Sequence, residues 1–198
     1  MGILFIISAP SGAGKTSLLK HVVAKDNDAS LSISYTTRAP RAGEICGLDY
    51  NFISYDAFLE MEKNGEFLEF AEVFGNMYGT AKSHVDSQLA AGDVLLELDW
   101  QGALNIKKIY PNAVWVFVLP PSIEVLANRL SSRNTNTEAD INSRLAQAKL
   151  DMKYAYNADY ALVNRDFEQA CAELLAVLHA ERLRISRQKL VVDAIIEN

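Results

Sequence analysis

The sequence predicts an α/β protein in which helices flank a parallel β-sheet. Continuous apolar, β-branched runs at residues 3–7, 94–98 and 114–119 are typical of strands that are buried on both faces of such a sheet. Each run is followed by a segment with helical character, and strands that alternate with helices favour parallel pairing. The 198 residues suit one compact unit, or one core with a small insertion.

The predicted helices carry apolar stripes that are typical of core-facing surfaces. Ser122 is the expected N-cap of one helix, in which Ile123, Leu126 and Leu130 fall on one face. The same spacing repeats in two later helices, at Ile141, Leu145, Ala148 and Met152, and at Phe167, Cys171, Leu174 and Leu178. A last strand is expected to end at Leu162 and Val163. We assign these stripes to packing and not to function.

Two segments interrupt this pattern. Between about residues 31 and 82, Tyr, Gly, Phe and mixed charge crowd together with several turn signals, which predicts an inserted, mainly short-stranded subdomain. A polar stretch at 131–138 joins two helical patterns, and such a stretch is typical of an exposed segment. We interpret it as part of a candidate lid.

Composition excludes several classes of protein. The 19 basic and 25 acidic residues give a net charge of −6, which argues against a nucleic-acid polymer as partner but allows a small phosphorylated ligand. The two cysteines, Cys46 and Cys171, cannot make a disulfide framework or a four-ligand zinc site. The apolar run at 3–7 is too short for a signal peptide, and no stretch suits a membrane span. These features predict a cytoplasmic protein without a membrane partner.

A glycine-rich loop follows the first predicted strand directly and precedes a helical segment. Gly12 and Gly14 allow successive backbone N–H groups to point inward, and the helix N-terminus adds partial positive charge. Lys15 can reach the β- and γ-phosphates of a nucleotide, and the Thr16 hydroxyl is placed to bind Mg²⁺. Ala9 stands where the general pattern begins with Gly. The context of strand, loop and helix predicts a P-loop, and hence a P-loop NTPase-type sheet.

A P-loop alone does not separate ATPases, GTPase switches and kinases. In the inserted segment Arg38 and Arg41 flank Pro40, and a polyproline-like backbone would project both guanidinium groups to one side. Such a pair suits a phosphate, although spacing alone is equally consistent with a solvated basic turn. Tyr50 and Tyr78 offer hydroxyl donors to the same site or aromatic surface for packing.

Acidic residues recur at every third position in Glu66, Glu69 and Glu72. A solvated face of a short element would show the same spacing. Spacing does not single out any one of the three carboxylates as a ligand for a substrate.

Blocks of sequence at residues 8–16, 34–44, 67–80 and 98–103 together resemble the successive signatures of the guanylate kinase family, in the family's order. The resemblance extends over nearly the whole chain, and the bacterial form is most similar. It implies a nucleoside monophosphate kinase that uses ATP and Mg²⁺ to phosphorylate GMP by direct in-line transfer. The implied parts are a P-loop core at 1–33 and 83–198 with a lid near 126–150, and a GMP-binding subdomain at 34–82.

The resemblance also implies roles for individual residues. The phosphate of GMP is assigned to Arg38, Arg41, Tyr50 and Tyr78, and its guanine to Ser34, Glu69, Thr80 and Asp99. ATP is assigned to the loop residues Ser11, Gly12, Ala13, Gly14, Lys15, Thr16 and Ser17, with Asn164 at the adenine. Catalysis is assigned to Lys15 and to the lid arginines Arg129, Arg133 and Arg144. A carboxylate can accept both the N1–H and the 2-amino group of guanine, which adenine lacks.

Three positions depart from the family pattern, namely Glu97, Asn134 and Arg165, where Asp, Gly and an acid are usual. Two alternatives remain beside GMP phosphorylation. A kinase for another monophosphate is disfavoured by Glu69 together with Ser34 and Thr80. A guanylate-kinase-like module that binds phosphopeptides is disfavoured because Lys15 and Thr16 are retained, as are the three lid arginines. No oligomeric state follows from the sequence.

Overall fold

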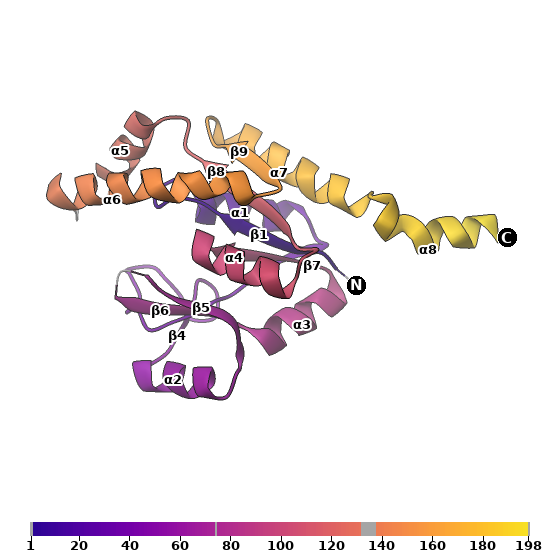
Figure 1. The fold of residues 1–198 in the computed structure, drawn as a ribbon, viewed down its shortest axis with the longest axis horizontal. Coiled ribbons are helices and arrows are strands. Elements are labelled where there is room, and N and C mark those ends of the chain that lie inside the picture. Colours follow the sequence, from indigo (N-terminus) through magenta and orange to yellow (C-terminus); the bar gives the residue numbers. More distant parts are fainter. Residues whose placement is uncertain (1, 74, 132–137, 198) are drawn as a thin grey trace.

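A parallel sheet forms the centre of the protein, which we describe from a computed structural model covering residues 2–73, 75–131 and 138–197 (Figure 1). The strand order is β2-β7-β1-β8-β9. These strands are β1 (Leu4–Ser8), β2 (Ala29–Ser32), β7 (Asp93–Leu98), β8 (Val114–Leu119) and β9 (Tyr160–Val163). All their pairings are parallel, so the predicted sheet class is confirmed.

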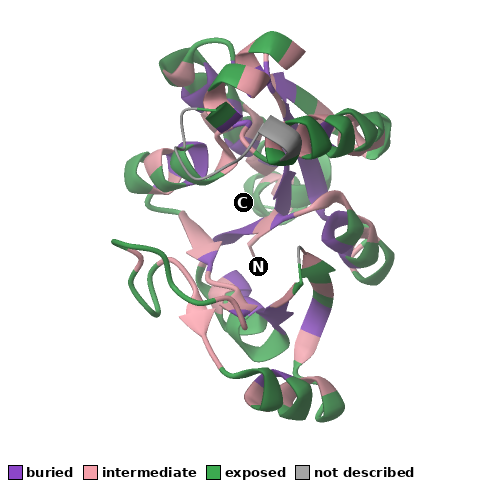
Figure 2. Cartoon of the chain, turned by 90° about the vertical axis from the view of Figure 1, so that its left-hand side faces the viewer, coloured by how far each residue is buried: buried purple, intermediate pink, exposed green. Residues whose placement is uncertain are grey.

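Helices cover both faces of this sheet. The covering helices are α1 (Lys15–Lys25) and α7 (Phe167–Arg182) on one face, and α3 (Lys82–Ala91) and α4 (Trp100–Ile109) on the other. Alternation along the central strand β1 serves both layers, because Phe5 and Ile7 pack toward α1 and α7 whereas Leu4 and Ile6 pack toward α3 and α4. Figure 2 shows the buried residues concentrated in this central layer.

A second, smaller sheet lies beside the core, with strand order β4-β3-β6-β5. Its elements are β3 (Tyr35–Thr36), β4 (Asn51–Phe52), α2 (Tyr55–Lys63), β5 (Phe67–Val73) and β6 (Asn76–Ala81). Phe58 of α2 is fully buried and stacks on Phe67 of β5 with 4.5 Å between ring centroids, so α2 closes the outer face of the sheet. The prediction of a separate short-stranded unit is confirmed.

Two helices lie on the side of the core opposite the small sheet (Figure 1), namely α5 (Ile123–Ser131) and α6 (Glu138–Asp151). The Ser122 hydroxyl accepts the N–H of Val125 at 3.2 Å, as expected for the predicted N-cap. Leu126 and Leu130 of α5 pack with Ala148 of α6 in a small buried cluster. Arg133 and Asn134, which the sequence analysis singled out, lie outside the described residues.

After a 3₁₀ turn η1 (Met152–Asn157), strand β9 and helix α7, the chain ends in α8 (Ile185–Ile196), which projects from the body (Figure 1). Arg182 fixes the end of α7, because its Nε donates to Asp93 at 2.7 Å and one terminal nitrogen lies 2.9 Å from Asp26. Within the described ranges, none of the helices combines the length and apolar character needed to cross a membrane.

Candidate active site

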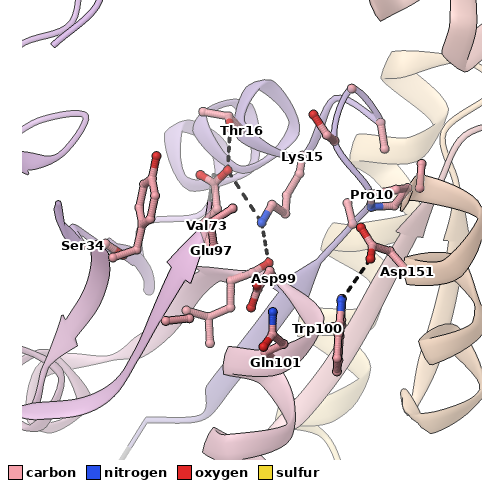
Figure 3. Close-up of a pocket in the computed structure, with 18 of the residues that line it drawn as sticks. Pro10, Lys15, Thr16, Ser34, Val73, Glu97, Asp99, Trp100, Gln101 and Asp151 are labelled. Atoms are coloured by element: carbon pink, nitrogen blue, oxygen red, sulfur yellow. Dashed lines mark hydrogen bonds and ion pairs between the residues drawn. The ribbon is translucent and has the colours of Figure 1, made fainter. Parts of the chain in front are cut away.

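A cavity of about 550 Å³ opens at the carboxyl end of β1, between the P-loop, the small sheet and α6 (Figure 3). It brings together most of the residues that the sequence analysis selected. Those lining it are Ser11, Gly12, Ala13, Gly14, Lys15, Thr16, Ser17, Ser34, Arg38, Arg41, Tyr50, Glu69, Tyr78, Asp99 and Arg144. Segments that are far apart in the sequence therefore meet around one space.

Three selected residues lie away from the cavity wall. Thr80, Arg129 and Asn164 are not among the lining residues that the structure describes, and Thr80 and Asn164 are almost fully buried. Arg133, the remaining selected residue, lies outside the described part of the chain. The resemblance therefore selected buried residues next to the cavity as well as residues that line it.

The P-loop leads directly from β1 into α1. Gly14 is the N-cap of α1 and has a φ of 93°, a left-handed conformation that glycine adopts without strain. A Cβ atom at this position would lie 2.7 Å from Nδ2 of Asn164, so a side chain would also collide with the residue behind the loop. The resulting turn leaves the first N–H groups of α1 open toward the cavity, an arrangement that favours an anion.

Lys15 and Thr16 both face Glu97 at the end of β7 (Figure 3). The ammonium group of Lys15 donates to the Leu98 carbonyl at 2.5 Å and lies 3.9 Å from Glu97. The Thr16 hydroxyl donates to the same carboxylate at 2.5 Å. Burial lowers the pKa of Lys15, and the negative charges of Glu97 and Asp99 oppose that change. Glu97 thus orients both polar side chains of the loop.

Arg38 is held by an acidic residue that the sequence analysis did not select. One of its terminal nitrogens donates to both oxygens of Glu44, at 2.9 and 3.0 Å, and its guanidinium lies 5.3 Å from the ring centroid of Tyr50. Glu44 also accepts the backbone N–H of Arg41 at 2.7 Å. The Arg38 hydrogen bonds lower the pKa of Glu44. Arg38 is therefore already oriented for a carboxylate-like or phosphate-like acceptor.

The structure distinguishes the three glutamates that spacing left equivalent. Glu66 and Glu72 are exposed, whereas Glu69 is 7% exposed. Glu69 and Glu72 both line the cavity, so burial is what sets Glu69 apart. Thr80 donates its hydroxyl to Oε1 of Glu69 at 2.7 Å. Burial raises the pKa of Glu69 to about 7, and the neighbouring charge of Asp99 adds to the rise. Glu69 is thus a buried acceptor that already receives a hydrogen bond from a neutral hydroxyl.

Gly102 gives Glu69 the space that it occupies. A Cβ atom on Gly102 would lie 2.8 Å from Oε2 of Glu69, so a larger residue here would force the end of the Glu69 side chain to move. Asp99 is the N-cap of α4 and accepts the Gly102 N–H at 2.8 Å. Sequence reasoning did not select Gly102, although it lies in the 98–103 block that carries the resemblance.

Arg129 and Asn164 support the P-loop from behind. The guanidinium of Arg129 donates to the carbonyls of Ala13 and Asn164, both at 3.2 Å. The side-chain amide of Asn164 donates to the same Ala13 carbonyl at 2.8 Å. In this arrangement both side chains are directed at the backbone of the loop.

Several further lining residues were not selected from the sequence. They include Glu97 at the end of β7, Trp100 and Gln101 at the start of α4, and Gln147 and Asp151 on α6. Gln147 and Asp151 fall three and seven positions after Arg144, on the same face of the helix. The helical spacing of these polar residues is visible in the sequence, but it lies beside the apolar stripe at Ile141, Leu145 and Ala148. We interpreted this helix from that stripe, as a packing element.

Comparison with known proteins places these features in one family. The family model for guanylate kinase matches residues 1–181. The chain is 50% identical to the guanylate kinase of Psychrobacter arcticus over 189 residues, covering 95% of this chain and 91% of the relative. It is 48% identical to that of Alcanivorax borkumensis over 198 residues, covering 100% and 96%.

A solved structure supports the same assignment. The crystal structure of guanylate kinase from Anaplasma phagocytophilum superimposes with a TM-score of 0.76 at 33% identity, over 94% of this chain and 89% of that one. The family match, the identities of the relatives and the shared fold agree with one another, and the resemblance drawn from the sequence is confirmed. The chain belongs to the guanylate kinase family.

Proposed function

We propose that this protein is an ATP-dependent kinase that converts GMP and ATP into GDP and ADP. One observation carries the proposal beyond family membership. The buried carboxylate of Glu69 and the P-loop residue Lys15 line the same cavity, so an acceptor for guanine and a phosphate-binding loop share one space. We place the reaction in cytoplasmic purine nucleotide metabolism, with no nucleic-acid polymer or membrane as partner.

Guanine binds at Glu69 in this proposal. Its carboxylate accepts the N1–H and the 2-amino group of the base, a pattern that adenine cannot supply. Because the Thr80 hydroxyl donates to Glu69, we assign Thr80 to orienting the carboxylate and Ser34 to the polar contact with the base. Asp99 lines the same wall, and its hydrogen bond to α4 fixes its place. An adenine ring would leave Glu69 without donors, which costs affinity.

The phosphate of GMP binds at Arg38 and Arg41, with hydroxyl donors from Tyr50 and Tyr78. All four line the cavity, and Arg38 is already oriented by Glu44. A phosphate dianion offers more acceptor oxygens than a carboxylate, so it can share or replace that partner. The insertion at 34–82 therefore supplies the GMP site in our proposal.

ATP binds to the P-loop residues 11–17 of the core, which comprises 1–33 and 83–198. Lys15 neutralises charge that develops between the β- and γ-phosphates, and Arg144 approaches the same oxygens from α6, within a lid near 126–150. Arg129 and Asn164 hold the loop, and Arg133 joins the lid arginines by resemblance. A phosphate oxygen of GMP is already a competent nucleophile, so the transfer needs positioning and charge stabilisation and no general base.

Mg²⁺ fits the oxygen-rich end of the loop. The Thr16 hydroxyl would hold it, with Glu97 accepting from that hydroxyl, and hard oxygen ligands of this kind suit the ion when phosphate oxygens complete the set. Within the described residues, no cluster of three or more His, Cys, Asp or Glu offers an all-protein metal site. When bound, Mg²⁺ would neutralise charge on the phosphate oxygens.

A coupled assay of ADP release tests the proposal. We expect release to depend on both ATP and GMP, with AMP, UMP and CMP supporting far lower rates. Release that favours another monophosphate would identify a different kinase. Phosphopeptide binding without any ADP release would identify an interaction module.

A further inference from the structure

Trp100 connects the guanine side of the cavity to helix α6. It follows Asp99 directly and lies in the first turn of α4, so its backbone position is fixed by the same N-cap that places Asp99. Its indole lines the cavity beside Gln101, as Figure 3 shows. The indole N–H extends toward α6 and donates to Oδ1 of Asp151 at 3.0 Å. One side chain thus joins two walls of the site.

The contact with α6 is built from three further side chains. Gln147 donates its amide to the same Oδ1 of Asp151 at 2.8 Å, so this oxygen accepts one bond from α4 and one from α6 itself. The indole also stacks face to face on Tyr154 of η1, with ring centroids 3.7 Å apart and planes 7° from parallel. One hydrogen bond therefore joins Trp100 to the carboxyl end of α6, and the stack joins it to η1, which follows α6 directly. The bond from Gln147 lies within α6 and holds the Asp151 carboxylate in place.

Arg144 lies on the face of α6 that this contact orients. Arg144, Gln147 and Asp151 are spaced at i, i+3 and i+7, and all three line the cavity. Seven residues of helix span roughly 10 Å, so a rotation of α6 by about 10° about its fixed end moves Arg144 by roughly 2 Å. The position of the arginine therefore depends on how its helix is attached.

We propose that Trp100 and Asp151 are positioning residues that set the reach of Arg144 toward the transferring phosphoryl group. This inference rests on the proposed function. Trp100 donates to Asp151, Asp151 holds the end of α6, and α6 presents Arg144 to the cavity. Stabilisation of the transition state depends more strongly on the position of Arg144 than binding of the substrate does. Loss of the contact between Trp100 and Asp151 should therefore lower kcat and leave KM for GMP close to its parent value.

Trp100→Phe tests the proposal with little loss of packing, since phenylalanine can still stack on Tyr154 but has no N–H to donate. We expect kcat to fall about tenfold or more, with KM for GMP changed less than about threefold. Asp151→Ala is expected to show the same split. Asp151→Asn keeps an acceptor oxygen and is expected to restore most of kcat, which a purely electrostatic role of the carboxylate would not allow.

Tyr110→Phe is the matched control. It removes an aromatic hydrogen-bond donor from the other end of α4, where the Tyr110 hydroxyl lies 3.3 Å from Asp86 at an exposed position. This variant is expected to retain the parent kcat. Melting temperatures of all variants identify any loss that comes from unfolding.

A double-mutant cycle shows whether Trp100 acts through Arg144. In an Arg144→Lys background, Trp100→Phe should cost much less in kcat than it costs in the parent. An equal loss in both backgrounds, or a loss confined to KM for GMP, would overturn the proposal. If the parent protein itself releases no ADP from ATP and GMP, the proposed function fails instead, so the two failures are distinguishable.

Discussion

The hydroxyl of Thr80 donates a 2.7 Å hydrogen bond to Oε1 of Glu69, and both residues are buried. This bond favours the ionised carboxylate, but burial has the larger effect and raises the pKa of Glu69 to about 7. Near neutral pH the residue therefore exists in both forms. In the proposed guanine site only the ionised form can accept two donors from the base, so we expect the protonation state of Glu69 to control GMP binding.

We expect kcat/KM for GMP to depend on pH through Glu69. The raised pKa means that the accepting form is present above about pH 7 and is lost as the pH falls below it. The profile should rise with pH and level off above about 8, when GMP is limiting. GMP has a phosphate that titrates as well, so the same profile in Glu69→Gln is the control. Identical profiles in the two proteins would show that Glu69 is not responsible.

The same pKa predicts a change in stability. The pKa of Glu69 is about 7 in the folded protein and 4.5 in the unfolded chain. Its contribution to the free energy of unfolding is therefore most favourable below pH 4.5 and is lost as the pH rises through 7. We expect Glu69→Gln to raise the free energy of unfolding at pH 8 by up to about 3 kcal/mol, with a smaller gain at pH 5. Urea unfolding at the two pH values measures the difference. Glu72→Gln, an exposed position on the same strand, is the control and should show no such gain.

Gly102→Ala should weaken GMP binding without weakening α4. The added Cβ would lie 2.8 Å from Oε2 of Glu69, so the carboxylate must move, whereas alanine is the better helix former. Loss of one charge-assisted bond corresponds to about a tenfold to hundredfold increase in KM for GMP, with KM for ATP unchanged. Asn105→Ala, on the exposed face of α4, is the control. A parent-like KM for GMP in Gly102→Ala would contradict the close packing of these two residues.

Lys15→Met should remove phosphoryl transfer while leaving GMP binding intact. Methionine keeps the approximate length of the side chain but not the charge that faces the phosphates, so we expect kcat to fall by about two orders of magnitude or more. GMP affinity, measured by calorimetry, should stay near the parent value because the insertion forms that site. Lys20→Met is a control on the same helix, where Lys20 pairs with Asp49 at the surface. A near-normal rate in Lys15→Met would contradict the P-loop assignment.

The sheet was largely predictable from the sequence, with one informative exception. Strands buried on both faces give continuous apolar runs, so those runs alone predicted β1, β7 and β8. Strand β2 was missed, because Ala29–Ser32 lies at the edge of the sheet and most of it is only partly buried. A strand at the edge of a sheet buries less side-chain surface and needs fewer apolar residues, so its apolar pattern is weak.

The choice of Glu69 could not be made from spacing for a specific physical reason. The register between β5 and β6 shifts between Phe67 and Glu69, so Leu68 and Glu69 are both buried although they are consecutive. Simple alternation along a strand would place these two side chains on opposite faces, so only one of them would be expected to be buried. The burial of Glu69 therefore could not be predicted from alternation. The resemblance, by contrast, selected the residue directly.

Contacts across long stretches of chain were also beyond the sequence. Arg129 and Asn164 reach the Ala13 carbonyl from more than one hundred residues away, and Trp100 meets Asp151 from another helix. Such pairs depend on how the layers stack, which local periodicity does not encode. The P-loop needed no such information, because its strand, glycines, lysine and helix are contiguous in the chain.

The preference for GMP over IMP in the parent and in Glu69→Gln tests the central claim most directly. IMP keeps the N1–H and O6 of guanine but lacks the 2-amino group, so it isolates one of the two bonds that we propose Glu69 accepts. We predict that Glu69→Gln lowers kcat/KM for GMP by about a hundredfold or more, that the preference over IMP shrinks, and that KM for ATP changes little. Ser34→Ala is the control and should affect GMP and IMP alike. An unchanged kcat/KM for GMP together with an unchanged GMP-to-IMP ratio in Glu69→Gln would contradict the account and direct attention to Asp99.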